Sequence, residues 1–126
     1  MAKRNLMKSI LVVEDDPGCL KNICAFLREE GYQVTEAHDG DEAIDLMTDA
    51  AFDLILTDIR MPRTNGIRLL DRVRAISPET PVILMTAFAP RRKRASAENL
   101  IIKPLILSQL LAKIDRAIEG KRAGKP

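Results

Sequence analysis

Four short hydrophobic runs, each followed by a residue that can bind a phosphoryl group or a metal ion, constrain the fold of this chain more than any other feature. The runs are 10–13, 54–57, 82–85 and 100–102, and they are followed by Glu14 with Asp15 and Asp16, by Asp58, by Thr86 and by Lys103. Helical patterns separate the runs, and this alternation is typical of βα units with a parallel sheet. Because ligands bind beyond the carboxyl ends of such strands, we expect these side chains to share one pocket.

The pattern predicts five strands, near residues 9–13, 32–36, 53–57, 81–85 and 99–102. Only 14 residues separate Met85 from Leu100. This is close to the minimum of about a dozen residues that a crossover between parallel strands needs. We therefore predict a shortened helix in the fourth crossover.

Four helices outside that crossover are predicted from capping residues and apolar spacing. Asp16–Pro17 is typical of an N-cap followed by proline in the first turn, and Gly31 ends that helix. Asp39–Glu42 resembles a capping box that opens a second helix. Apolar residues at helical spacing predict two more, over 67–76 and 107–118.

Length and charge indicate one domain with basic ends. The 126 residues suit a single domain, which we divide into a basic N-terminal extension (1–8), a folded domain (9–119) and a flexible tail or linker start (120–126). Half of the 20 basic residues lie near the two ends and in the run 91–94, and the rest of the chain carries a net charge of −8. Aromatic residues are only 3%, which argues against stacking on nucleobases. We interpret 91–94 as a solvated face, so nucleic-acid binding by this domain is not expected.

The chain shows no apolar run long enough to cross a membrane and no signal-peptide core in its first residues. Cys19 and Cys24 lie five residues apart on one predicted helix, a separation that excludes a disulfide between them. Free cysteines agree with a reducing compartment. We therefore expect a cytoplasmic protein without a membrane partner.

The acidic residues after the first and third strands predict a cation site. Asp16 is interpreted as a helix cap, but Glu14, Asp15 and Asp58 would repel one another unless a cation lay between them. Mg²⁺ suits this arrangement because it takes oxygen ligands and keeps several waters. Lys103 would serve as a counter-ion and as a donor to phosphate oxygens.

Four stretches, SILVVEDDP, DLILTDIRMPRTNG, TPVILMTA and LIIKPL, resemble in order and spacing the blocks that mark bacterial response-regulator receiver domains. The resemblance covers residues 9 to about 118 and implies an α/β, flavodoxin-like, doubly wound five-stranded parallel sheet. By this resemblance Asp58 is the phosphoacceptor, phosphorylated by a histidine kinase. Asp15, Asp58 and the backbone carbonyl of Arg60 would bind Mg²⁺, and Glu14 would act through a water.

The same resemblance implies that Thr86, Ala87 and Lys103 bind the phosphoryl group, and that the Lys103–Pro104 peptide is often cis. The chain departs from the family at Leu100, the switch position, where an aromatic residue is usual. Its fourth crossover is also several residues shorter than is typical. Both departures affect the region that normally carries output.

The function predicted from these residues is a phosphoacceptor module of a two-component phosphorelay, which is not a turnover enzyme. Its partners would be a histidine kinase or phosphotransfer protein and an output partner that the sequence does not identify. The alternative is a receiver-like module for constitutive protein interaction. An aspartyl-phosphate phosphatase is disfavoured, because that class needs a second aspartate two residues after the nucleophile, where this chain has Arg60 after Asp58 and Pro17 after Asp15.

Overall fold

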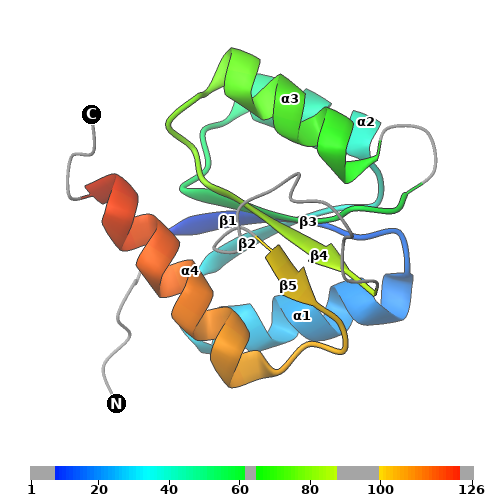
Figure 1. The fold of residues 1–126 in the computed structure, drawn as a ribbon, viewed down its shortest axis with the longest axis vertical. Coiled ribbons are helices and arrows are strands. Elements are labelled where there is room, and N and C mark those ends of the chain that lie inside the picture. The colour runs from blue at the N-terminus through cyan, green and yellow to red at the C-terminus, as the bar shows by residue number, and fades with distance from the viewer. Residues whose placement is uncertain (1–7, 62–64, 88–99, 123–126) are drawn as a thin grey trace.

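A parallel sheet of five strands forms the centre of the molecule (Figure 1), in the order β2-β1-β3-β4-β5. The computed structural model describes residues 8–61, 65–87 and 100–122. The strands are β1 (Ser9–Val13), β2 (Gln33–Ala37), β3 (Leu54–Asp58), β4 (Val82–Thr86) and β5 (Leu100–Ile102). The order is that of the flavodoxin-like doubly wound fold. The predicted strands are confirmed, although β2, β3 and β4 begin one residue later than predicted.

Four helices in the described part of the chain cover the two faces of the sheet. Helices α1 (Pro17–Glu29) and α4 (Leu107–Arg122) lie on one face, and α2 (Gly40–Asp49) and α3 (Gly66–Ile76) lie on the other (Figure 1). The short helix predicted between β4 and β5 falls in 88–99, outside the described residues. Helix α4 continues to Arg122, three residues past the predicted domain boundary. Its buried Ile118 anchors the last turns against the core.

The predicted caps form, with one difference. Asp16 accepts a hydrogen bond from the Gly18 N–H at 3.1 Å, and Gly31 has a φ of 101°, a conformation that glycine adopts without steric cost. Asp39 accepts from the Glu42 N–H at 2.8 Å, as a capping box requires. The Glu42 carboxylate, however, accepts from the His38 N–H at 2.7 Å, one residue before the cap.

The core lies on both faces of the sheet. Ile10 and Val12 of β1 pack toward α1 and α4, and Leu11 and Val13 pack toward α2 and α3. Burial on both faces explains why the three central strands, β1, β3 and β4, are continuous hydrophobic runs rather than alternating patterns. The edge strand β2 is more polar and only partly buried. The sheet therefore holds the strand ends, where the polar residues lie, in a fixed arrangement.

The remaining sequence predictions concern the cysteines and the membrane. Cys19 and Cys24 are free, as predicted. Burial is the main reason that the pKa of each thiol is raised to about 11. Within the described ranges, no helix combines the length and apolar character needed to span a bilayer.

Candidate functional site

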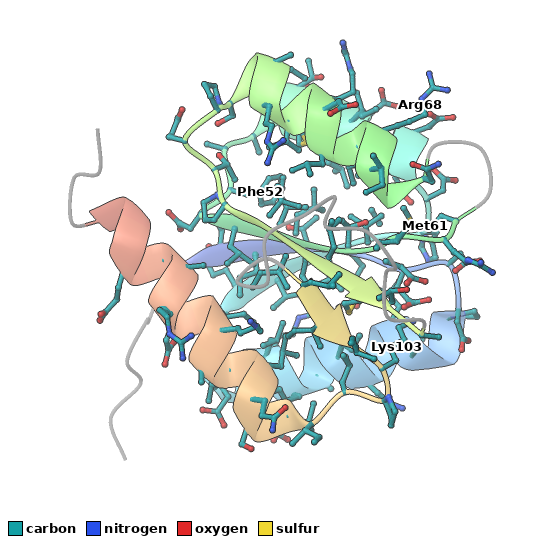
Figure 2. All side chains as sticks on the ribbon, viewed as in Figure 1. Phe52, Met61, Arg68 and Lys103 are labelled. Carbon is teal, nitrogen blue, oxygen red and sulfur yellow. The ribbon has the colours of Figure 1, made fainter. Side chains whose placement is uncertain are left out.

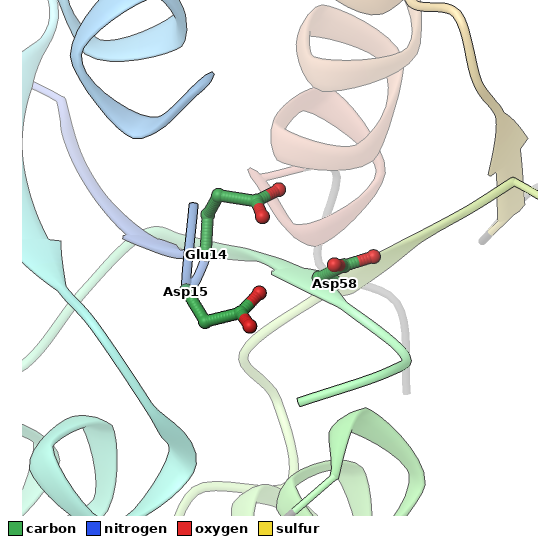
Figure 3. A group of neighbouring side chains, drawn as sticks. All are labelled: Glu14, Asp15 and Asp58. Atoms are coloured by element: carbon green, nitrogen blue, oxygen red, sulfur yellow. The ribbon is translucent and has the colours of Figure 1, made fainter. Parts of the chain in front are cut away.

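Three carboxylates meet at the carboxyl end of the sheet. Glu14 and Asp15 follow β1, and Asp58 ends β3, the strand beside it; Val13 and Thr57 are paired in the register. One oxygen from each carboxylate lies within 4.8 Å of the others (Figure 3). Glu14 is only 1% exposed and Asp58 only 7%, whereas Asp15 is exposed. The predicted convergence of these acids is confirmed.

Lys103 closes the other side of the cluster. It follows β5, and its Nζ donates a hydrogen bond to Glu14 Oε1 at 3.0 Å and lies 3.4 Å from Asp58 Oδ2. The predicted counter-ion is therefore in place, although its closer partner is Glu14. One ammonium against three carboxylates leaves the cluster with negative charge.

The electrostatics of the site follow from this imbalance. Burial raises the pKa of Asp58, the charge on Glu14 raises it further, and Lys103 opposes both. Burial alone would lower the pKa of Lys103, but its hydrogen bond to Glu14 and the charge on Asp58 outweigh burial and raise it. Lys103 therefore stays protonated, and the ionised form of Asp58 would be stabilised by further positive charge.

The donor atoms suit a hard divalent cation. All three groups offer carboxylate oxygen, the ligand that Mg²⁺ prefers, and the exposure of Asp15 leaves room for the waters that Mg²⁺ keeps. Both oxygens of Glu14 already accept hydrogen bonds, Oε1 from Lys103 and Oε2 from the Asp16 N–H at 3.2 Å. Because both oxygens accept hydrogen bonds, contact between Glu14 and a metal through a water is favoured over direct coordination. Arg60 lies two residues past Asp58 and is exposed.

The N-terminus of α3 packs tightly against the backbone of Asp58. The Gly66 N–H donates to the Ile59 carbonyl at 2.8 Å. A Cβ at Gly66 would lie 2.8 Å from Ile59 Cα and would overlap the Asp58 carbonyl oxygen, so only glycine fits. Asn65 caps α3 by accepting from the Arg68 N–H at 2.9 Å. This cap was not predicted from the sequence, although asparagine before an apolar helical run is an N-cap signal.

Thr86 and Lys103 also come together at this edge. Thr86 is buried at the end of β4, beside β3, where Asp58 pairs with Met85. The Thr86 carbonyl accepts a hydrogen bond from the Lys103 N–H at 2.6 Å. Ala87, the next residue, is exposed.

Leu100, at the switch position, is half-buried and packs against the core on the side of α2 and α3. It pairs with Leu84 in the register of β4 and β5. The Lys103–Pro104 peptide is cis, as the resemblance implies.

Comparison with known proteins identifies the family. The response regulator receiver domain matches residues 10–115. The chain belongs to this family. It is 36% identical over 118 residues to the transcriptional regulatory protein ZraR of Salmonella typhimurium, covering 90% of this chain and 27% of ZraR.

Two solved structures support the assignment. The response regulator TrrA of Thermotoga maritima, in complex with Mg²⁺–BeF, has a TM-score of 0.80 and 30% identity, covering 88% of this chain and 99% of that one. The chemotaxis protein CheY4 of Vibrio cholerae has a TM-score of 0.81 and 28% identity, covering 88% of this chain and 98% of CheY4.

Family membership establishes the class of activity. Receiver domains are signalling modules of two-component systems rather than enzymes that turn over a separate substrate, and they interact with histidine kinases. They bind Mg²⁺ at an acidic pocket, and in this chain Glu14, Asp15 and Asp58 form an acidic cluster. The chain spans about a quarter of the length of ZraR, so the activity of that whole regulator is not carried over.

Proposed function

We propose that this receiver domain accepts a phosphoryl group on Asp58 from a histidine kinase or a phosphotransfer protein. The observation that carries the proposal is the meeting of one oxygen each from Glu14, Asp15 and Asp58 within 4.8 Å, with Lys103 Nζ 3.4 Å from Asp58 Oδ2. A buried carboxylate beside an acidic cation site and a fixed ammonium has the parts that phosphoryl transfer requires.

In the proposed reaction a carboxylate oxygen of Asp58 forms a bond to the phosphorus of a phosphohistidine. The phosphorus–nitrogen bond breaks at the same time, and the imidazole leaves with the electron pair. The transition state is loose, so the protein contributes mainly by in-line positioning and by neutralising charge. The packing of α3 against the Asp58 backbone through Gly66 fixes the attacking carboxylate.

Asp15, Asp58 and the backbone carbonyl of Arg60 would hold Mg²⁺, and Glu14 would contact it through a water. When bound, Mg²⁺ supplies the positive charge that neutralises the phosphoryl oxygens. The complex of TrrA with Mg²⁺–BeF supports this assignment, because TrrA shares the fold over 88% of this chain.

Lys103 donates to one phosphoryl oxygen, and the Thr86 hydroxyl donates to another. Lys103 Nζ donates a hydrogen bond to Glu14 Oε1 at 3.0 Å. This bond positions the ammonium close enough to Asp58 to reach a group attached there. Ala87 is small, so its side chain leaves space for the incoming group. The departure at Leu100 affects output rather than this chemistry, because its half-buried side chain packs into the core.

The alternative, a constitutive interaction module, is not favoured, because the acids and Lys103 converge as a phosphoacceptor site requires. The output partner stays unidentified. A cytoplasmic location and the absence of nucleic-acid binding by this domain stay predictions from the sequence.

Intact-mass analysis after incubation with a small-molecule phosphodonor and Mg²⁺ tests the proposal. We expect the wild-type protein to gain one phosphoryl group, and Asp58→Ala to gain none. Asp53→Asn, at the opposite end of β3, is the matched control and should be labelled like the wild type. Labelling of Asp58→Ala, or no labelling of the wild type, would refute the assignment.

A further inference from the structure

Helices α2 and α3 carry opposite charges on adjacent surfaces. They pack against each other on one face of the sheet (Figure 1). Asp41, Asp45 and Asp49 are exposed and lie four residues apart on α2, so they form an acidic stripe. Helix α2 contains no basic residue. Its outer side is therefore uniformly negative.

The outer side of α3 is mainly positive. Arg68 and Arg72 are exposed and lie four residues apart, forming a basic stripe, and Arg74 adds a third exposed cation. Figure 2 shows Arg68 on the outer side of α3. Asp71 is the single acid of this helix, so the three arginines leave a net positive charge.

Two acids of the first stripe and both arginines of the second take part in no ion pair within the described residues. No ion pair in that part of the chain involves Asp45, Asp49, Arg68 or Arg72. Like charges four residues apart on one helix repel by a few tenths of a kcal/mol. A surface with the opposite pattern would relieve this repulsion on both helices.

We propose that a second copy of this chain supplies that surface, and that two copies associate through their α2–α3 faces. A two-fold axis that runs parallel to the helices, between α2 and α3, places the acidic stripe of each copy over the basic stripe of the other. Such an interface is isologous, so each favourable contact occurs twice.

The charged residues of the two stripes lie at nearly matching positions along their helices. Asp45 is the sixth residue of α2 and Arg72 is the seventh of α3; Asp41 is the second and Arg68 the third. Both helices begin at the carboxyl edge of the parallel sheet and have nearly equal lengths, 10 and 11 residues. In both stripes the spacing of four residues corresponds to a rise of about 6 Å.

The same face also has an apolar part. Ile76, at the end of α3, is 43% exposed. It borders a pocket of about 330 Å³ between the last turns of α2 and α3, lined also by Met47, Phe52 and Ile55. Contact between two such ends would bury apolar surface in addition to pairing charges.

The contact is small, which sets its expected strength. Helices of 10 and 11 residues are about 15 Å long, so the buried area falls in the range of weak, transient complexes. The Debye length falls from about 30 Å at 0.01 M salt to about 3 Å at 1 M, so high salt screens the attraction between the stripes. We therefore expect a dimer that forms at low salt and dissociates at high salt.

Sedimentation equilibrium of three charge variants, beside the wild type, tests the proposal without Mg²⁺ or phosphorylation. The variant Asp45→Lys/Asp49→Lys makes both helices basic, and Arg68→Glu/Arg72→Glu makes both acidic. We expect each alone to raise the dimer dissociation constant by at least about tenfold, and an equimolar mixture to restore a mixed dimer. Lys21→Glu/Arg116→Glu, on α1 and α4 of the opposite face, changes the charge equally and should dimerise like the wild type.

A wild type that is monomeric at low salt over the accessible concentrations would overturn the proposal. So would variants that dimerise as well as the wild type, or a mixture that stays monomeric. Thermal unfolding of each variant confirms that it is folded. The proposed dimer does not depend on phosphoryl transfer. Its failure would leave the proposed function untouched, and failure of the proposed function would leave the dimer untouched.

Discussion

The two ends of β3 each carry an aspartate, and the two residues have opposite surroundings. Asp53, just before the strand, accepts hydrogen bonds from the Ser9 N–H at 2.8 Å and from the Ser9 hydroxyl at 3.4 Å. Asp58, at the other end, faces two further carboxylates and the ammonium of Lys103. One strand therefore holds a carboxylate that is satisfied by neutral donors and a carboxylate that is crowded by like charge.

The difference separates an acid with a structural role from the acid that we propose as the phosphoacceptor. Hydrogen bonds from neutral donors let Asp53 join the start of β3 to the start of β1. Among the described residues Asp58 has no such set of neutral donors, so the fold holds it in an environment that a cation and a phosphoryl group would improve.

The largest effect is expected from removing the ammonium beside Asp58. Lys103→Ala should lower the rate of phosphorylation by about 100-fold, since the loss of one positioned donor to a developing charge commonly costs that much. Time courses of phosphoryl labelling by intact mass measure this rate. Asp53→Asn should label at the wild-type rate; an equal loss in both variants would mean that the contrast between the two ends is false.

The next effect concerns backbone packing at the Asp58 end. Gly66→Ala forces a Cβ into the Asp58 carbonyl and toward Ile59 Cα, so we expect a loss of about 1–3 kcal/mol in the free energy of unfolding. Gly120→Ala is the matched control, because nothing lies within 4 Å of its added Cβ. Because Gly120 lies in a helix, Gly120→Ala should raise the free energy of unfolding by about 0.5–1 kcal/mol. Denaturant unfolding measures both, and a neutral Gly66→Ala would contradict the tight packing.

The smallest effect compares the stabilities of the two aspartate variants without metal. Asp58→Asn should raise the free energy of unfolding at pH 7 by about 1 kcal/mol, because it removes a crowded negative charge. Asp53→Asn should lower it by about as much, since bonds to an ionised acceptor are stronger than bonds to a neutral one. Urea unfolding in EDTA measures both; a change of the same sign at both ends would refute the comparison.

The gain from Asp58→Asn should depend on pH in a defined direction. Folding raises the pKa of Asp58, chiefly by burial, so its ionised form is disfavoured in the native state. The stability that the protonated form contributes is present below the unfolded pKa, near 4, and is lost as the pH rises through the folded pKa. The advantage of the asparagine variant should therefore be complete above the folded pKa and disappear as the pH falls below about 4.

Much of the fold and of the site could be predicted from local patterns. The central strands β1, β3 and β4 were recognisable because burial on both faces makes them continuous hydrophobic runs. Asp16 and Asp39 marked helix starts because capping depends on residues only two or three positions apart. The hydrogen bond between Lys103 and Glu14, by contrast, joins residues 89 positions apart. Local patterns could not show that Lys103 would bond to Glu14 in preference to Asp58.

The sequence by itself determined which residues could do chemistry and at which strand ends they lie, because strand and helix periods depend on near neighbours. Only the tertiary structure decided how those residues share their partners: Lys103 bonded to Glu14, Asp53 satisfied by Ser9, and an acidic helix packed beside a basic one. Strand order, register and helix packing set these distances. They arise from the burial of the whole core, so no local pattern encodes them.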